Sequence, residues 1–178
     1  MRTYLLFVVV ALWLGGCTGL PDQVEPVGGF DSGRYLGTWY EIARLDHSFE
    51  RGLSRVTAEY SLREDGSIRV LNRGYDAEEQ GWKTAEGRAK FVGPRTQGHL
   101  KVSFFGPFYA SYVIFELDPA YSTAYIAGYN HDYLWLLSRN PQLSDAAKTR
   151  FVEVVERKGF SVDDLIWVDQ SPIRAKEP

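Results

Sequence analysis

Residues 31–43 read DSGRYLGTWYEIA, and the fold of the chain depends on what surrounds the Gly-x-Trp of this stretch, Gly37 to Trp39. A Gly-x-Trp alone is uninformative, because it arises readily by chance. Glycine permits a tight turn of the backbone, and Asp31 is of a residue type that caps short helices. The stretch is therefore compatible with a short helix and a turn, followed by a first strand with Trp39 and Glu41 on the same side.

The segments that follow alternate apolar and polar residues, which is typical of strands with one dry and one wet face. This pattern is present in residues 56–63, 68–72, 84–91 and 100–105. Glu64-Asp65-Gly66 supplies a hairpin turn between the first two of them. Small residues at inward positions, such as Ala58, Ala85 and Gly87, indicate room inside a barrel.

Three later segments, 112–117, 125–129 and 134–137, are apolar on both faces, so something must cover their outer side. A helix is predicted just after them, with Ser144 as its N-cap and Gly159 as the residue that follows it. Its apolar stripe consists of Ala147, Phe151, Val154, Val155 and Lys158. We expect this helix to pack outside the barrel, and residues 165–168 to form a last strand beside the first.

The first sixteen residues are typical of a secretion signal. Arg2 supplies the positive charge of the amino-terminal region, and small residues precede Cys17. Residues 4–14 form an apolar core that is too short to span a bilayer. A short membrane anchor or a buried first strand is the alternative. Because Cys17 is the single cysteine and follows Leu14-Gly15-Gly16 directly, we favour residues 1–16 as a lipoprotein signal peptide and residues 17–29 as a lipidated tether.

Residues 14–17 resemble the lipobox of bacterial lipoproteins. The resemblance implies attachment of diacylglycerol to Cys17, cleavage before it, and acylation of the new amino terminus. Three acyl chains would hold the protein to a membrane permanently, because two are already enough for stable anchoring. Thr18 stands where inner-membrane lipoproteins of the enterobacterial type have Asp, which favours the outer membrane, with the folded domain facing the periplasm.

Residues 31–43 resemble the opening signature of lipocalins, and two further signatures follow in order: Asp132-Tyr133 and Arg139. His131 departs from the family pattern, which has Thr there. The stretch 102–109, VSFFGPFY, adds a similarity to bacterial members of the family. The resemblance implies a mainly β fold: an eight-stranded antiparallel up-and-down calyx barrel over residues 30–170, one helix outside it near the C-terminus, and a tail at 171–178.

In lipocalins the signature tryptophan fills the closed end of the barrel and the arginine lies across its ring. By this resemblance Gly37, Trp39, Asp132, Tyr133 and Arg139 are structural residues, the alternative being that Trp39 and Arg139 touch a ligand. A cation–π contact of this kind stabilises by about 0.5 to 2 kcal/mol.

Other functional classes find little support in the sequence. The net charge is −3 and the cations are scattered, so no nucleic-acid partner is expected. His47, His99 and His131 lie far apart, and we predict neither a metal site nor a cofactor. Nucleophile and phosphate-loop motifs are missing, and the acidic pairs lie in turn-like stretches. We therefore predict no enzyme and no catalytic residue.

The predicted ligand wall follows from strand parity, with Tyr109 near the mouth: Val56, Ala58, Tyr60, Leu100, Phe104, Tyr109, Tyr112 and Trp135. Glu41 falls on the same side as Trp39, so it either lies near the floor with an arginine partner or the local parity is broken. Four roles are open for the aromatic residues in the stretch 104–109: ordinary packing, a ligand mouth, a membrane contact or a homodimer interface.

The function implied by the resemblance is storage or transport of fatty acids or lysophospholipids at the outer membrane. A scaffolding lipoprotein with a filled barrel is the main alternative, and a small lipid-modifying enzyme is a more distant one.

Overall fold

The computed structural model describes residues 18–172, so the predictions for the signal peptide, for Cys17 and for most of the tail lie outside the described residues. Its strands are β1 (Gly37–Arg44), β2 (Leu53–Leu62), β3 (Ile68–Asp76), β4 (Gly81–Phe91), β5 (His99–Phe105), β6 (Phe108–Leu117), β7 (Thr123–Ala127), β8 (Leu134–Ser138) and β9 (Ile166–Trp167). Its helices are α1 (Ser32–Tyr35), α2 (Asp145–Arg157) and a short 3₁₀ turn, Val162–Asp164.

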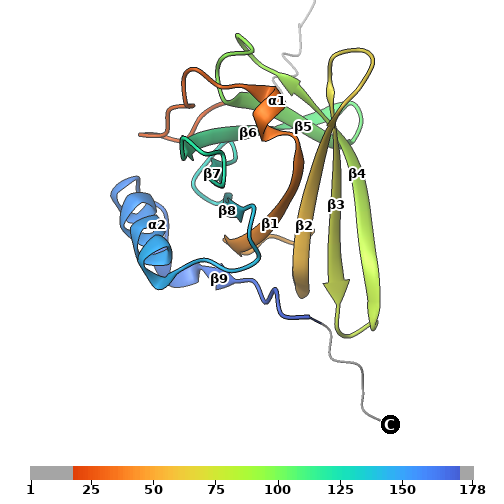
Figure 1. The fold of residues 1–178 in the computed structure, drawn as a ribbon, viewed down its shortest axis with the longest axis vertical. Coiled ribbons are helices and arrows are strands. Elements are labelled where there is room, and N and C mark those ends of the chain that lie inside the picture. The colour runs from red at the N-terminus through yellow and green to blue at the C-terminus, as the bar shows by residue number, and fades with distance from the viewer. Residues whose placement is uncertain (1–17, 173–178) are drawn as a thin grey trace, which may run out of the picture.

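Strands β1 to β8 form a closed antiparallel barrel, in which each strand pairs with the next and β1 pairs with both β2 and β8. β9 adds to the free part of β1, with Ala43 opposite Trp167. The predicted eight-stranded barrel, its up-and-down order and the last strand beside the first are confirmed (Figure 1).

Helix α2 begins after Ser144, whose side chain accepts a hydrogen bond from the backbone of Ala147. Its buried residues, Phe151, Val154 and Val155, pack on the outward side chains of β1, β6, β7 and β8. Leu134 and Leu136 point toward this helix, while Trp135 and Leu137 point into the barrel. The two-faced apolar pattern of the later strands is thus explained, and the predicted helix outside the barrel is confirmed (Figure 1).

The barrel has two different ends, and the connections between successive strands lie alternately at one end and at the other. The closed end holds α1 and the connections 63–67, 92–98 and 118–122. The other end, here called the mouth, holds the connections 45–52, 77–80, 106–107 and 128–133. Residues 45–52, which connect β1 to β2, form the longest connection at the mouth and are here called the lid.

Residues 18–29 were predicted to be a tether, and the structure corrects this. Val24 is 3% exposed. Val27 donates a backbone hydrogen bond to Ile114 (2.9 Å) and accepts one from Gly98 (2.9 Å). The segment therefore lies against the outside of β5 and β6. Pro21 and Val24 of this stretch are packing residues, and composition alone did not distinguish them from a linker.

The barrel is open along one seam. β4 pairs with β5 only over Arg88–Phe91, so its first half extends past the edge of β5 (Figure 1). Ala85 and Ala110 occupy inward positions by strand register, yet both are exposed to solvent. Gly87 lies against the ring of Phe104, which fills the seam where the two strands part. The described helices, for their part, include none long and apolar enough to cross a bilayer.

Candidate functional site

The closed end is built around Trp39, which is fully buried. Its Nε1 donates a hydrogen bond to the carbonyl of Tyr35 (2.8 Å), and the guanidinium carbon of Arg139 lies 4.0 Å from its ring centroid. Arg139 also donates to the carbonyls of Thr38 (2.7 Å) and Leu36 (2.7 Å). The arginine thus satisfies carbonyls that the short helix α1 leaves free, and it covers the tryptophan at the same time.

Gly37 has a positive φ of 95°, and a Cβ at this position would lie 3.3 Å from Nη1 of Arg139. A side chain here would be strained by the backbone and would press on the arginine. Asp31 caps α1 by accepting a hydrogen bond from the backbone of Gly33 (2.8 Å).

Above this floor, three tyrosine hydroxyls form a chain. The hydroxyl of Tyr112 lies 2.7 Å from that of Tyr35 and 2.7 Å from that of Tyr60. Burial raises the pKa of all three, so each stays a neutral phenol. Three O–H groups share two internal hydrogen bonds, which leaves one proton to donate elsewhere.

The structure places most predicted wall residues on the inner side of the barrel. Ala58, Tyr60 and Leu100 belong to the interior apolar cluster, and Phe104, Tyr112 and Trp135 pack against it. Val56 is buried under Gly74 of the neighbouring strand. Contact of these side chains with a ligand stays a prediction.

One predicted wall residue, Tyr109, lies on the other face of its strand. Tyr109 was predicted near the mouth of the cavity, but its ring lies on the outer face, 5.3 Å from Nζ of Lys101 and 5.9 Å from Nζ of Lys90. Tyr112 lies inside, as predicted, although its hydroxyl is bound to other tyrosines rather than free at the mouth. Tyr109 and Tyr112 are three residues apart on β6, so alternation along the strand places them on opposite faces, and the inward assignment of Tyr109 was wrong.

Toward the mouth, the interior holds a buried charge cluster. Nη1 of Arg44 donates a hydrogen bond to Oε1 of Glu41 (2.7 Å), and the two residues are 1% and 3% exposed. A register shift between Glu41 and Ala43 adds one residue to β1, so Glu41 and Arg44 point to the same side. Glu41 therefore has an arginine partner, as one alternative predicted, but the pair lies toward the mouth rather than near the floor. The parity holds from Trp39 to Glu41 and breaks only after Glu41.

The lid is fixed to the barrel through this cluster. Nη2 of Arg44 donates to the carbonyl of Glu50 (2.8 Å), and Nε1 of Trp135 donates to Oε2 of Glu50 (3.1 Å). His47 stacks on Phe49 with centroids 4.0 Å apart, and its Nε2 lies 3.2 Å from Glu50 outside hydrogen-bond geometry. Sequence analysis missed Arg44, His47 and Glu50, because polar residues beside a turn are ordinarily solvated.

The carboxyl groups of Glu41 and Glu50 repel each other inside this cluster, and burial disfavours a second negative charge there. Burial, and then the charge of Glu50, raise the pKa of Glu41 well above its ordinary value, against the opposing effect of Arg44. Burial also raises the pKa of Glu50. Burial and Arg44 lower the pKa of His47 to about 4, so this ring is neutral at pH 7. One carboxylate and Arg44 then balance in charge.

Asp132 and Tyr133 lie at the mouth, far from the Trp39–Arg139 pair in the barrel. Asp132 accepts a hydrogen bond from Nδ2 of Asn130 (2.7 Å) within the β7–β8 connection. The ring of Tyr133 stacks near that of Trp135, with centroids 6.2 Å apart. These residues shape the turn beside the lid.

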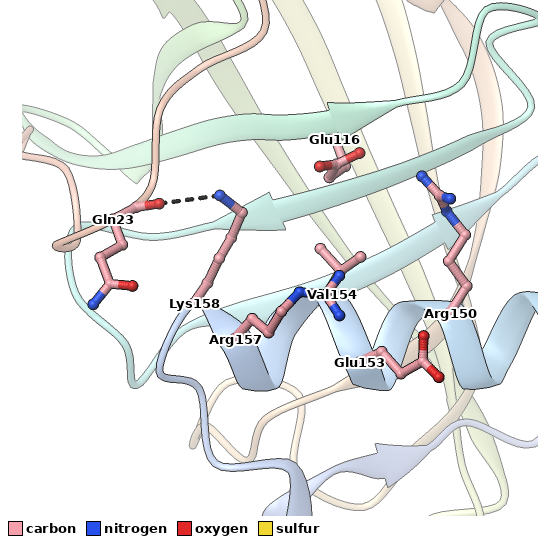
Figure 2. Close-up of a pocket in the computed structure, with 7 residues that line it drawn as sticks. All are labelled: Gln23, Glu116, Arg150, Glu153, Val154, Arg157 and Lys158. Carbon is pink, nitrogen blue, oxygen red and sulfur yellow. Dashed lines mark hydrogen bonds between the residues drawn. The ribbon is translucent and has the colours of Figure 1, made fainter.

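A groove on the outside of the barrel, of about 430 Å³, lies between α2 and β6 (Figure 2). Its lining residues are mostly charged: Gln23, Glu116, Arg150, Glu153, Val154, Arg157 and Lys158. Nζ of Lys158 donates to the carbonyl of Gln23 across it (3.0 Å). Such a lining is unsuited to an acyl chain. Among residues 18–172 no group of three His, Cys, Asp or Glu side chains is placed to hold a metal ion.

Comparison with known proteins agrees with this architecture. The family model for the lipocalin-like domain matches residues 30–170. The chain belongs to the lipocalin family. Outer membrane lipoprotein Blc of Vibrio cholerae is 55% identical over 171 residues, covering 96% of this chain and 99% of the relative. Its counterpart in Escherichia coli strain K12 is 53% identical over 150 residues, covering 84% and 85%.

Solved structures give the same fold. The crystal structure of the cockroach allergen Per a 4 superposes with a TM-score of 0.67 at 25% identity, covering 86% of this chain and 96% of the other. The family and the fold predicted for this lipocalin are confirmed. Lipocalins are binding proteins for small hydrophobic molecules, which makes the interior of the barrel the candidate binding site.

Proposed function

We propose that this lipocalin is an outer-membrane lipoprotein that holds one single-chain lipid, a fatty acid or a lysophospholipid, inside its barrel. The observation that supports this most is an apolar interior that reaches solvent along the open seam, where Ala85 and Ala110 are exposed on the inner side. The names of the Vibrio cholerae and Escherichia coli relatives agree with the predicted outer-membrane location.

The acyl chain would run along the inner side of β2, β5 and β6. Ala58 and Leu100 are buried there beside the tyrosine hydroxyls, and Trp39 forms the floor. An apolar interior with one spare hydroxyl proton suits a flexible chain with few polar atoms better than a rigid polar molecule.

The polar end of the lipid would lie at the lid. Nε of Arg44 is buried and has no hydrogen-bond partner among residues 18–172, so it can donate to a carboxylate or phosphate oxygen. Lipid entry on this side displaces Glu50 from Trp135, which makes the lid a gate. Binding, rather than catalysis, is the role proposed for these groups.

Membrane attachment in this proposal is through acylated Cys17, the residue directly before the described part of the chain. Storage or transport of lipids at the membrane then takes place next to the pool from which they come. A second copy of the chain is not needed to complete the barrel.

A titration with lysophospholipids of increasing chain length tests the proposal. Affinity should rise by up to about fourfold per methylene, because each buried methylene contributes about 0.8 kcal/mol. Ala85→Trp should block the seam and weaken binding at least tenfold. The matched control is Ala146→Trp on the exposed face of α2, which should bind as the unaltered protein does.

Affinities that do not depend on chain length, or an Ala85→Trp protein with unaltered binding, would contradict the proposed site. No binding of any chain length would instead support the scaffolding alternative, in which the side chains of the protein itself fill the barrel.

A further inference from the structure

The turn between β5 and β6 exposes two phenylalanines to water. Phe105 is 82% exposed and Phe108 is 77% exposed, the highest values for large apolar side chains within residues 18–172. They lie opposite each other at the ends of the two strands. Adjacent exposed aromatic rings of this kind mark contact surfaces in soluble proteins.

The beginning of the described chain lies beside this turn. Oγ of Ser111 on β6 donates a hydrogen bond to the carbonyl of Gly19 (2.6 Å). Ser111 is three residues from Phe108, a distance of about 10 Å along a strand. Leu20, next to Gly19, is 42% exposed. Cys17 precedes Gly19 by two residues, so the chain reaches its attachment point within about 7 Å.

Cations and a tyrosine connect these two places. Lys90, Lys101 and Ser111 stand opposite one another across β4, β5 and β6, on the outer face of the sheet. The ring of Tyr109 lies next to both lysines. Neither lysine is paired with a carboxylate in the part of the chain that the structure describes, whereas Glu86 nearby is held by Arg69 (2.8 Å).

We propose that Phe105, Phe108, Tyr109, Lys90 and Lys101 form a docking face for the anionic lipid surface of the leaflet that carries the anchor. The phenylalanines enter the acyl region, while the tyrosine and the two ammonium groups lie among the headgroups. A membrane is favoured over a protein partner because the attachment point of the acyl chains is on the same face. The inference rests on the proposed acylation of Cys17.

The turn also belongs to the mouth end of the barrel, so docking brings the rim of the barrel to the lipid surface. A lipid leaving the leaflet then has a short path to the open seam between β4 and β5. The acyl anchor sets the distance from the membrane, and the docking face sets the orientation.

A single-thiol label tests the docked orientation in the acylated full-length protein, where the thioether at Cys17 leaves no other thiol. Phe108→Cys and the control Ala146→Cys are each labelled with the fluorophore NBD and reconstituted into vesicles of phosphatidylethanolamine and phosphatidylglycerol at 3:1. The label at 108 should shift its emission to the blue by about 10 nm or more and be quenched by nitroxides on the lipid acyl chains. The label at 146 should remain in water. Equal emission and quenching at both positions would overturn the proposal.

A second measurement separates the docking face from the anchor and from ligand binding. A Cys17→Ser protein, secreted with a cleavable leader, should sediment with the same vesicles, and Phe105→Ser/Phe108→Ser should lower that binding at least tenfold. Leu62→Ser, at an exposed leucine of β2 near the closed end of the barrel, is the control and should leave it unchanged. Lysolipid affinity is measured on the same variants, so that a failure of the lipid site is seen independently. If the double variant instead dissociates a dimer of the soluble protein and leaves vesicle binding intact, the face is an interface between copies and the proposal is wrong.

Discussion

Trp135 and Glu50 join the barrel to its lid through one hydrogen bond, from Nε1 of the indole to Oε2 of the carboxyl group at 3.1 Å. Trp135 belongs to β8, and Glu50 lies 85 residues earlier in the connection between β1 and β2. Opening the lid therefore changes the surroundings of one indole directly. This makes Trp135 the natural reporter of events at the mouth.

Trp135 should respond to lipid. Displacing Glu50 removes the hydrogen bond to the indole and replaces nearby polar groups with an acyl chain, so tryptophan emission should change saturably during a lysolipid titration. Trp135→Phe should abolish most of that change. Trp82→Phe is the control, because Trp82 lies outside the barrel under Arg73, whose guanidinium is 4.0 Å from the ring centroid. An undiminished signal in Trp135→Phe would contradict the assignment.

Trp39 and Arg139 should be energetically coupled. Trp39→Ala removes a large ring from a closed floor and should cost about 3 to 5 kcal/mol of stability. Arg139→Ala leaves buried carbonyls of α1 without donors and should cost about 1 to 3 kcal/mol. A double-mutant cycle, measured by urea unfolding of the soluble Cys17→Ser protein, should give a coupling energy of at least about 0.5 kcal/mol. Additive losses would mean that the two side chains stabilise the fold independently.

The Glu41–Glu50 pair should make stability depend on pH. Their pKa values are raised on folding, so the folded state keeps a proton on the pair to higher pH than the unfolded state does. The stabilisation is complete below the ordinary value of 4.5 and is lost as pH rises through the raised values. Glu50→Gln cannot ionise, so its stability should fall less between pH 5 and pH 8 than that of the unaltered protein.

Urea unfolding at the two pH values measures this difference. Glu59→Gln, at an exposed carboxylate on the outer side of β2, serves as the control and should follow the unaltered protein. If Glu50→Gln also followed it, the buried carboxyl pair would not keep a proton in the folded state at raised pH.

Cys17 should determine where the protein resides. Cys17→Ser, placed behind a leader that a general signal peptidase removes, can form no thioether and should be recovered in the soluble periplasmic fraction, because the docking face without acyl chains binds lipid only weakly and reversibly and needs an excess of vesicles to retain the protein. Its circular dichroism and thermal unfolding should be unchanged, because the substitution lies outside the barrel. Radiolabelled palmitate should mark the unaltered protein only. Palmitate incorporation into the serine variant would contradict attachment at Cys17.

The sequence predicted the fold well because the signals were local and repeated. Alternation along β2 to β5 and the caps of α2 needed no knowledge of distant contacts, and the signature from Asp31 to Trp39 supplied the closure of the barrel by resemblance. The pairing of Arg139 with Trp39 also came from that resemblance, since nothing local relates residues so far apart in the chain.

The errors arose where strand periodicity is interrupted. A bulge after Glu41 turned Arg44 inward, and a register shift after Val102 interrupts the pairing of β5 with β6. A pattern of period two cannot show either irregularity. The docked segment that includes Val24 resembled a linker in composition, because its hydrogen bonds are to Gly98 and Ile114, which are distant in sequence.

The central claim is that the barrel interior holds a single-chain lipid, and native mass spectrometry of protein extracted gently from membranes tests it most directly. The account predicts a species heavier by the mass of one fatty acid or lysophospholipid, which is released on unfolding, is strongly depleted in Ala85→Trp and is retained in Ala146→Trp. A protein that carries no lipid, or one that carries the same lipid in both variants, would contradict it.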